Sequence, residues 1–138
     1  MVLKNEVDKI MNNLRKFLTK LQIAYKVRNN YIKLYLNSEN YQIIQFFYEK
    51  NWIKMFFIKN DEIIIYLRYI NNKPLFSKIK FISTSGHRKY YNNKSIVFFK
   101  KHCGGNANIL LYTSFGLKSL KFAENLLIGG EIVCLLYE

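Results

Sequence analysis

The chain of 138 residues has few of the residues that break or cross-link a fold. It contains one proline, Pro74, and two cysteines, Cys103 and Cys134, whose spacing matches no zinc motif. So few cysteines exclude a disulfide-based scaffold and favour a reducing compartment. Its apolar runs fall far short of the roughly eighteen residues that a membrane span needs, so the sequence predicts a soluble globular protein.

Acidic residues are missing from a long central stretch. The sequence has 22 Lys and Arg against 9 Asp and Glu, a net charge of +13, and no acid lies between Glu62 and Glu124. Such a field opposes compaction unless a polyanion neutralises it, so nucleic acid is the leading predicted partner. A solvated basic surface on an unrelated fold is the alternative. An anionic membrane is less favoured, because no helix concentrates the charge opposite a broad apolar face.

The residue types that catalysis needs are scattered along the chain. Among the acids only Asp61 and Glu62 are adjacent, and both fall in an expected hairpin turn. Neither His87 nor His102 has an obvious carboxylate to orient it, and the adjacent side chains of His102 and Cys103 are poorly placed to share a metal ion. The sequence therefore predicts a protein that is not an enzyme and uses no cofactor, metal or small-molecule substrate.

Hydrophobic periodicity predicts the elements of a first lobe, residues 1–83. They are an amphipathic helix with an apolar stripe from Val7 to Leu21, a strand over 30–36, a helix that Asn37 or Ser38 can cap and that runs to Lys50, and strands over 52–58, 62–70 and 76–83. The last three strands predict an antiparallel three-stranded meander. Asn51 suits a left-handed residue after the second helix.

Glycine is absent from the first 85 residues and occurs six times after them. This change of texture predicts a second lobe, residues 84–138, that is a small mixed α/β unit with glycine-hinged turns. Its expected elements are a short helix over 95–101, a strand over 109–113, a helix over 120–127 and a strand over 131–137. The fold class is α+β, with two small lobes packed together.

The segment YTSFG, residues 112–116, is followed by Lys118 and Lys121. Hydroxyls at the end of a strand, a glycine and two lysines beside a helix start suit the shallow minor groove of RNA, which exposes ribose hydroxyls. A plain turn followed by a helix cap explains the same residues equally well. Phe115 at the loop tip is expected to meet RNA or a neighbouring protein, whereas Tyr112 is more simply part of the core.

Three successive segments carry a family resemblance: STSGHRKYY at 83–91, YTSFGLKSLKFA at 112–123 and IGGEIVC at 128–134. In sequence and order they resemble the eighth protein of the bacterial-type small ribosomal subunit, and the segments IMNNLRK and FFYEKNWI extend a weaker resemblance to the N-terminal half. The chain departs from the family pattern at Ser85, Tyr112 and Phe115, and by roughly three extra residues around 103–106.

The resemblance implies that the second lobe binds the central domain of small-subunit rRNA and that the first lobe touches a neighbouring RNA helix. Arg15 and Ser38 would be the N-terminal contacts. Residues implied on the RNA-facing surface of the second lobe are Tyr90, Thr113, Ser114, Gly116, Gly130 and Glu131. The basic charge and the loop add Arg88, Phe115, Lys118 and Lys121.

Eighteen lysines against four arginines, with abundant Asn, Ile, Tyr and Phe, are typical of an AT-rich genome, and the N-terminus lacks the features of a targeting presequence. We therefore expect an organelle-encoded structural constituent of a small ribosomal subunit, in the mitochondrial matrix first and a plastid second, that helps rRNA assembly. Expected partners are the rRNA and neighbouring small-subunit proteins, with no membrane. The rival prediction is a basic module that binds nucleic acid or acidic proteins outside the ribosome.

Overall fold

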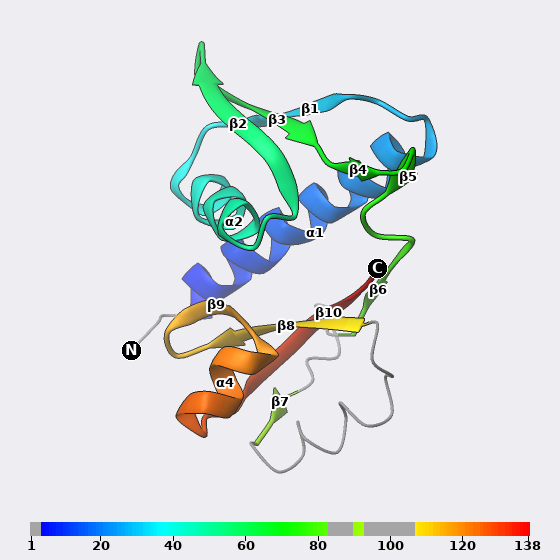
Figure 1. Ribbon diagram of the computed structural model, residues 1–138. Helices are drawn as coiled ribbons and strands as arrows, with labels where there is room; N and C mark the ends of the chain where they lie inside the picture. The colour runs from blue at the N-terminus through cyan, green and yellow to red at the C-terminus, as the bar shows by residue number, and fades with distance from the viewer. Residues whose placement is uncertain (1–3, 83–89, 93–106) are drawn as a thin grey trace. The chain divides into compact units, whose positions relative to one another are not determined.

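The computed structural model describes residues 4–82, 90–92 and 107–138 of the chain (Figure 1). The chain divides into two compact units, Met1–Leu75 and Phe76–Glu138. The sequence predicted this division after residue 83. The difference arises because the strand over residues 78–81 pairs with the C-terminal strand of the chain. The helix expected over 95–101 lies outside the described residues.

The N-terminal unit consists of two helices and a three-stranded antiparallel sheet in the order β1-β3-β2. Its elements are α1 (Lys4–Lys26), β1 (Tyr31–Tyr35), α2 (Ser38–Glu49), β2 (Ile53–Lys59) and β3 (Glu62–Leu67). Both helices lie on the same side of the sheet (Figure 1). The core-facing residues of the sheet alternate along the strands, as Ile32 and Leu34 do in β1 and Ile63 and Ile65 do in β3.

The ends of α2 follow local rules that the sequence already indicated. The side chain of Asn37 accepts a hydrogen bond from the backbone N–H of Asn40 at 2.7 Å, so Asn37, and not Ser38, caps the helix. After the helix, Asn51 has a φ of 60°, which confirms the expected left-handed residue. These local signals fix where the helix begins and ends without reference to the rest of the fold.

The expected meander is wrong in its third strand. The chain after β3 forms a small separate hairpin of β4 (Tyr69–Ile70) and β5 (Lys73–Pro74) around two asparagines with positive φ. The next strand, β6 (Lys78–Phe81), then pairs with the C-terminal strand of the chain. In the N-terminal sheet, β1 lies beside β3 where the strand over 76–83 was expected. The alternation of residues along a strand specifies its buried face but not the strand beside it.

The C-terminal unit is built around its last strand, β10 (Gly130–Tyr137). Its other elements are β6, β7 (Tyr90–Tyr91), β8 (Ala107–Thr113), β9 (Gly116–Ser119) and α4 (Leu120–Leu126). β10 pairs with β8 along one edge and with β6 and β7 along the other, and β8 also pairs with β9; every pairing is antiparallel. Since β10 is the centre of the sheet, residues 76–82 belong to this unit.

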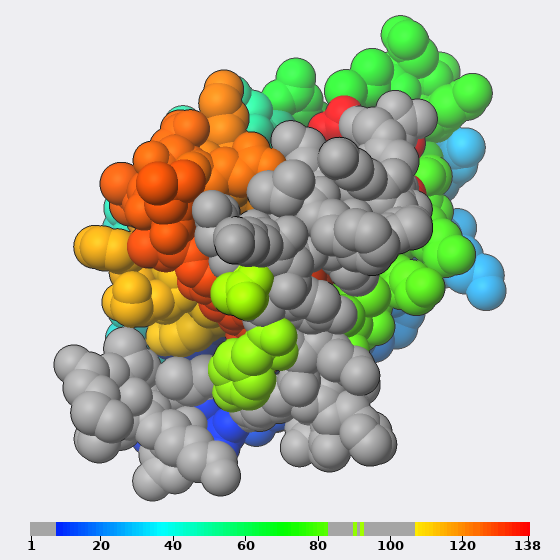
Figure 2. All heavy atoms as spheres, turned by 90° about the horizontal axis from the view of Figure 1, so that it is seen from below, coloured from blue at the N-terminus to red at the C-terminus, as the bar shows by residue number. Residues whose placement is uncertain are grey.

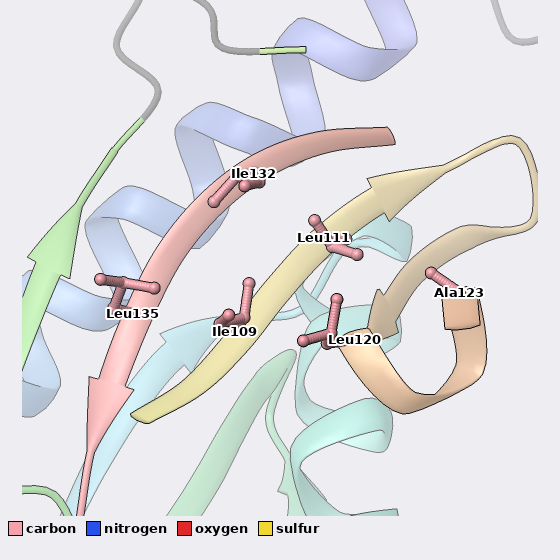
Figure 3. Packing of buried hydrophobic residues seen from close by; sticks show 6 residues of the cluster. All are labelled: Ile109, Leu111, Leu120, Ala123, Ile132 and Leu135. Atoms are coloured by element: carbon pink, nitrogen blue, oxygen red, sulfur yellow. The ribbon is translucent and has the colours of Figure 1, made fainter. Parts of the chain in front are cut away.

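The core of the C-terminal unit lies between the sheet and α4 (Figure 3). Six buried side chains from three elements form it: Ile109 and Leu111 of β8, Ile132 and Leu135 of β10, and Leu120 and Ala123 of α4. The predicted α+β class with antiparallel sheets is confirmed. Within the described residues, no helix has the length and apolarity required to cross a membrane.

Candidate nucleic-acid interface

The hairpin between β8 and β9 turns through Ser114 and Phe115, both of which are exposed. The hydroxyl of Thr113 donates to the carbonyl oxygen of Gly116 at 3.0 Å and accepts from the backbone N–H of Phe115 at 3.1 Å. Gly116 has a φ of 98°, and a glycine with positive φ is common at the end of a short hairpin connection. The turn therefore has a defined shape, with the Ser114 and Phe115 side chains presented outward.

Thr113 was predicted to face RNA, but its side chain is only 3% exposed and its hydroxyl is used inside the turn. Gly130 is similarly constrained by the protein itself. A Cβ at Gly130 would lie 2.8 Å from the carbonyl oxygen of Tyr112 and 3.2 Å from the Thr113 methyl group. Gly130, which the resemblance implied on the RNA-facing surface, thus lies close to the chain's own backbone in β8.

Phe115 belongs to a small aromatic and cationic cluster. Its ring meets that of Phe122 in α4 edge to face, with centroids 5.9 Å apart, and the ammonium of Lys118 lies 4.8 Å from the centroid of the Phe122 ring. Phe115 is nevertheless 61% exposed. The cluster thus holds an apolar ring and a positive charge side by side at the surface, an arrangement that suits a base and its phosphate.

Tyr90 and Glu131 lie opposite each other in the β7–β10 ladder, and Glu131 also pairs with Tyr112 of β8. This register places all three at the same end of the sheet as the Ser114 turn. Tyr90 is 69% exposed, whereas Glu131 is 2% exposed. Figure 2 shows the β7 segment (light green) and α4 (orange) on one face of the molecule. Tyr90 is therefore available to a partner at this end of the sheet, whereas Glu131 is buried.

The remaining predicted residues fall into three groups. Lys121 is exposed in the first turn of α4. Arg15 is half-buried on α1, and Ser38 is exposed at the start of α2, where its hydroxyl donates to a Glu39 carboxylate oxygen at 3.2 Å. Both therefore lie in the N-terminal unit, away from the hairpin in sequence. Arg88 lies outside the described residues.

Cys134 is fully buried in β10, and burial raises the pKa of its thiol well above the ordinary value. A neutral buried thiol is a small apolar side chain and a poor nucleophile or ligand. Over the described parts of the chain, no three His, Cys, Asp or Glu side chains gather as a metal site would require. Both His87 and His102 fall outside the described residues, as does Cys103.

Sequence reasoning missed Phe122, which joins Phe115 to Lys118. Lys118 lies in β9 and Phe122 in α4, so helical spacing does not apply to the pair and no local pattern indicated their contact. Sequence reasoning also singled out neither Tyr31 nor Tyr35, which lie on the exposed side of β1.

Comparison with known proteins identifies the family of the chain. A family model described as ribosomal protein S8 matches residues 12–137. The chain belongs to the ribosomal protein S8 family. A small ribosomal subunit protein uS8 of Borrelia garinii subsp. bavariensis is 32% identical over 122 residues, which cover 85% of this chain and 90% of that protein.

Two further S8 relatives carry organellar names. Protein uS8c of Cyanidium caldarium is 30% identical over 135 residues, covering 93% of this chain and 99% of that protein. Protein uS8m of Acanthamoeba castellanii is 31% identical over 124 residues, covering 88% and 95%. The S8 family consists of structural proteins of the small ribosomal subunit and not of enzymes. The family resemblance read from the three C-terminal segments is confirmed.

Proposed function

We propose that this S8 protein binds the central domain of small-subunit rRNA through the β8–β9 hairpin end of its C-terminal unit and helps that RNA to assemble. The observation that carries the proposal is the Ser114 turn, in which a buried Thr113 hydroxyl shapes the loop and leaves the Ser114 hydroxyl exposed. A preshaped loop loses little conformational freedom when it binds. Ser114 can then exchange hydrogen bonds with ribose or base groups.

The other predicted residues either contact the RNA directly or hold the shape of the surface that does. Phe115 and Tyr90 offer exposed rings for contact with unpaired bases, and Lys118 and Lys121 supply positive charge for phosphates. Thr113 and Gly130 act indirectly, because one bonds inside the turn and the other lets β10 lie close to β8. Glu131 is a structural carboxylate of the sheet in this scheme. Arg15, Ser38 and Arg88 are further proposed RNA contacts.

The organellar assignment is part of the proposal. It is supported by the lysine-rich composition and by relatives whose names are those of chloroplast and mitochondrial forms. The mitochondrial matrix is the first choice and a plastid the second. Fractionation of organelles followed by detection of the protein by mass spectrometry tests it. Recovery outside both organelles would contradict the assignment and leave the RNA proposal intact.

Sedimentation and crosslinking test the ribosomal role. The protein should travel with the small subunit on a sucrose gradient, and sequencing of RNA crosslinked to it should return the central domain of the small-subunit rRNA. Ser114→Ala should weaken equilibrium binding to that RNA by about 1 kcal/mol or more, because an RNA group loses its hydrogen-bond partner. Asn125→Ala, in an exposed position of α4, is the control.

The alternative is a basic module that binds nucleic acid or acidic proteins outside the ribosome. It predicts that the protein stays at the top of the gradient and crosslinks to RNA of many kinds. Wild-type affinity of Ser114→Ala, in a protein with an unchanged melting temperature, would reject the hairpin as the surface that binds rRNA.

A further inference from the structure

The N-terminal sheet carries aromatic side chains on the side that the helices do not cover. In β1 the exposed residues Tyr31, Lys33 and Tyr35 alternate with the buried Ile32 and Leu34. The exposed fractions are 47% for Tyr31 and 70% for Tyr35. Large rings in such positions are not needed for the core, so they are free to meet something outside the unit.

The strand register gathers these rings into one surface. Tyr31 lies opposite Tyr66 of β3, with ring centroids 5.8 Å apart, and Tyr66 stacks on Phe57 of β2 at 5.9 Å with an interplanar angle of 29°. Phe57 is itself 38% exposed. We call Tyr31, Tyr35, Phe57 and Tyr66 the aromatic sheet face. Neither Arg15 nor Ser38, the N-terminal contacts expected from the sequence, belongs to it.

A basic hollow adjoins each end of the Tyr31–Tyr66 pair. The hollow beside Tyr66 has a volume of about 690 Å³ and includes Lys54 and Arg68 in its wall. The hollow beside Tyr31 has a volume of about 430 Å³ and includes Lys20 and Lys33. Among the residues that the structure describes, no acid lines either hollow. Positive charge therefore lies on both sides of the stacked rings.

Two of the four basic groups are held in place by the backbone. The Lys20 ammonium donates to the carbonyl oxygen of Lys33 at 2.9 Å, and the Arg68 guanidinium donates to that of Asn51 at 2.7 Å. An ammonium has three donors and a guanidinium five, so each group retains donors that can reach a bound anion. Anchored in this way, the two charges lose little freedom when a phosphate arrives.

We propose that the aromatic sheet face is a second RNA site, which binds a single-stranded segment by stacking its bases on Tyr31, Tyr66 and Phe57 while phosphates enter the two basic hollows. Stacking on aromatic rings combined with a positively charged path is the way in which proteins bind single strands without strict sequence preference. Paired bases are not available for such stacking, so the segment must be unpaired.

The charges on this surface favour RNA over a protein segment. Among the residues projecting from this side of the three strands, Glu62 is the acid, and in the register it lies between Tyr35 and Lys59 at the far end from both hollows. An acidic protein segment would satisfy the lysines but would leave the flat rings without matching planar partners. Bases and phosphates together match both features of the surface.

Binding of a fluorescein-labelled single strand of ten uridines to the full chain tests the proposal. Replacing both Tyr31 and Tyr66 by Leu keeps apolar bulk but removes the rings, and should weaken binding at least about tenfold. The double Phe variant should bind like the wild type. Lys54→Ala with Arg68→Ala should lower the log-log salt slope by up to about 1.4. Tyr48→Ala is the matched control, since Tyr48 is 49% exposed on α2.

Ultraviolet crosslinking of the same strand, with peptides read by mass spectrometry, locates the contact. Crosslinks at Tyr31, Phe57 or Tyr66 are expected. Crosslinks confined to the C-terminal unit, or wild-type affinity of the folded double Leu variant, would overturn the proposal. If the double Leu variant kept its affinity for the uridine strand but no longer joined the small subunit, the proposal would also be overturned. That result would indicate that a protein occupies the aromatic sheet face. Binding of Ser114→Ala to the central-domain rRNA is measured separately, so the two proposed surfaces succeed or fail independently.

Discussion

The hydroxyl of Thr113 bridges the β8–β9 turn by donating to the carbonyl oxygen of Gly116, 3.0 Å away. The Thr113 hydroxyl oxygen also accepts a hydrogen bond from the backbone N–H of Phe115 at 3.1 Å. The hydroxyl therefore satisfies a donor and an acceptor of the turn at once, in a side chain that is almost fully buried. The shape of the loop that presents Ser114 depends on this one group.

Thr113→Val keeps the volume of the side chain and removes its hydroxyl. We expect the free energy of unfolding to fall by about 1–3 kcal/mol, because two part-buried backbone groups of the turn lose their hydrogen-bond partner. Binding to the central-domain rRNA should weaken as the loop loses its shape. Thr113→Ser, which keeps the hydroxyl, should retain both properties. Urea unfolding and equilibrium RNA binding measure the two effects, and a stable, tightly binding Val variant would contradict this account of the turn.

Gly130→Ala tests the close approach of β10 to β8. The added Cβ would meet the Tyr112 carbonyl oxygen at 2.8 Å, and backbone cannot rotate away as a flexible side chain can. We expect a loss of about 1–3 kcal/mol of stability, as for other overpacked positions. Combining it with Thr113→Ser removes the methyl contact at 3.2 Å and should recover only a small part of the loss. Full recovery would show that the methyl, and not the carbonyl, is the obstacle.

Phe115→Ala removes an exposed ring and should leave stability nearly unchanged. If the ring stacks on an unpaired base, RNA binding should weaken by about 1–3 kcal/mol with the same dependence on salt. Leu127→Ala is the control, because Leu127 is 74% exposed in the same unit. Equal small losses for both variants would mean that Phe115 is merely a surface residue. Thermal melting and binding at two salt concentrations are the measurements.

Lys118→Ala should change the salt dependence of RNA binding, which Phe115→Ala should leave unchanged. If the Lys118 ammonium contacts a phosphate, its removal should lower the slope of log affinity against log salt by up to about one. Its packing on Phe122 at 4.8 Å suggests that Lys118→Met, which keeps an extended apolar chain over the ring, preserves the cluster while losing the charge. Both variants should then share the reduced slope. An unchanged slope in both would place this lysine outside the phosphate contacts.

Stability should decrease at alkaline pH because of Cys134 and Tyr25. Burial raises the pKa of both groups above their ordinary values of 9.0 and 10.0, and for Tyr25 the nearby Tyr69 adds to the effect. The neutral forms are thus favoured in the folded chain. The contribution of these two groups to the free energy of unfolding is complete below about pH 9. It is lost as pH rises, because the two groups ionise at lower pH in the unfolded chain than in the folded chain. Urea unfolding from pH 7 to 11 should show a decline that is shallower in Cys134→Ala. An equal decline would exclude the thiol as its source.

The sequence alone determined the class of elements and the family, and it predicted a polyanionic partner. Apolar periodicity predicted α1, α2, β8 and β10, and Asn51 indicated the end of α2, because these signals act over a few residues. The acid-free interval indicated a polyanion. Three C-terminal segments identified the S8 family, since their residues and order are specific.

Only the tertiary structure decided which strands are neighbours and which side chains reach the surface. The alternation in β6 specifies a buried face, but its pairing with β10 depends on hydrogen bonds between segments more than fifty residues apart. For the same reason, the sequence did not predict that the Thr113 hydroxyl is buried or that Gly130 contacts Tyr112. Nor did it predict the ring pairs of the aromatic sheet face, because Tyr31 and Tyr66 meet only once β1 pairs with β3. Long-range pairing is set by the packing of the whole unit, and no local pattern encodes it.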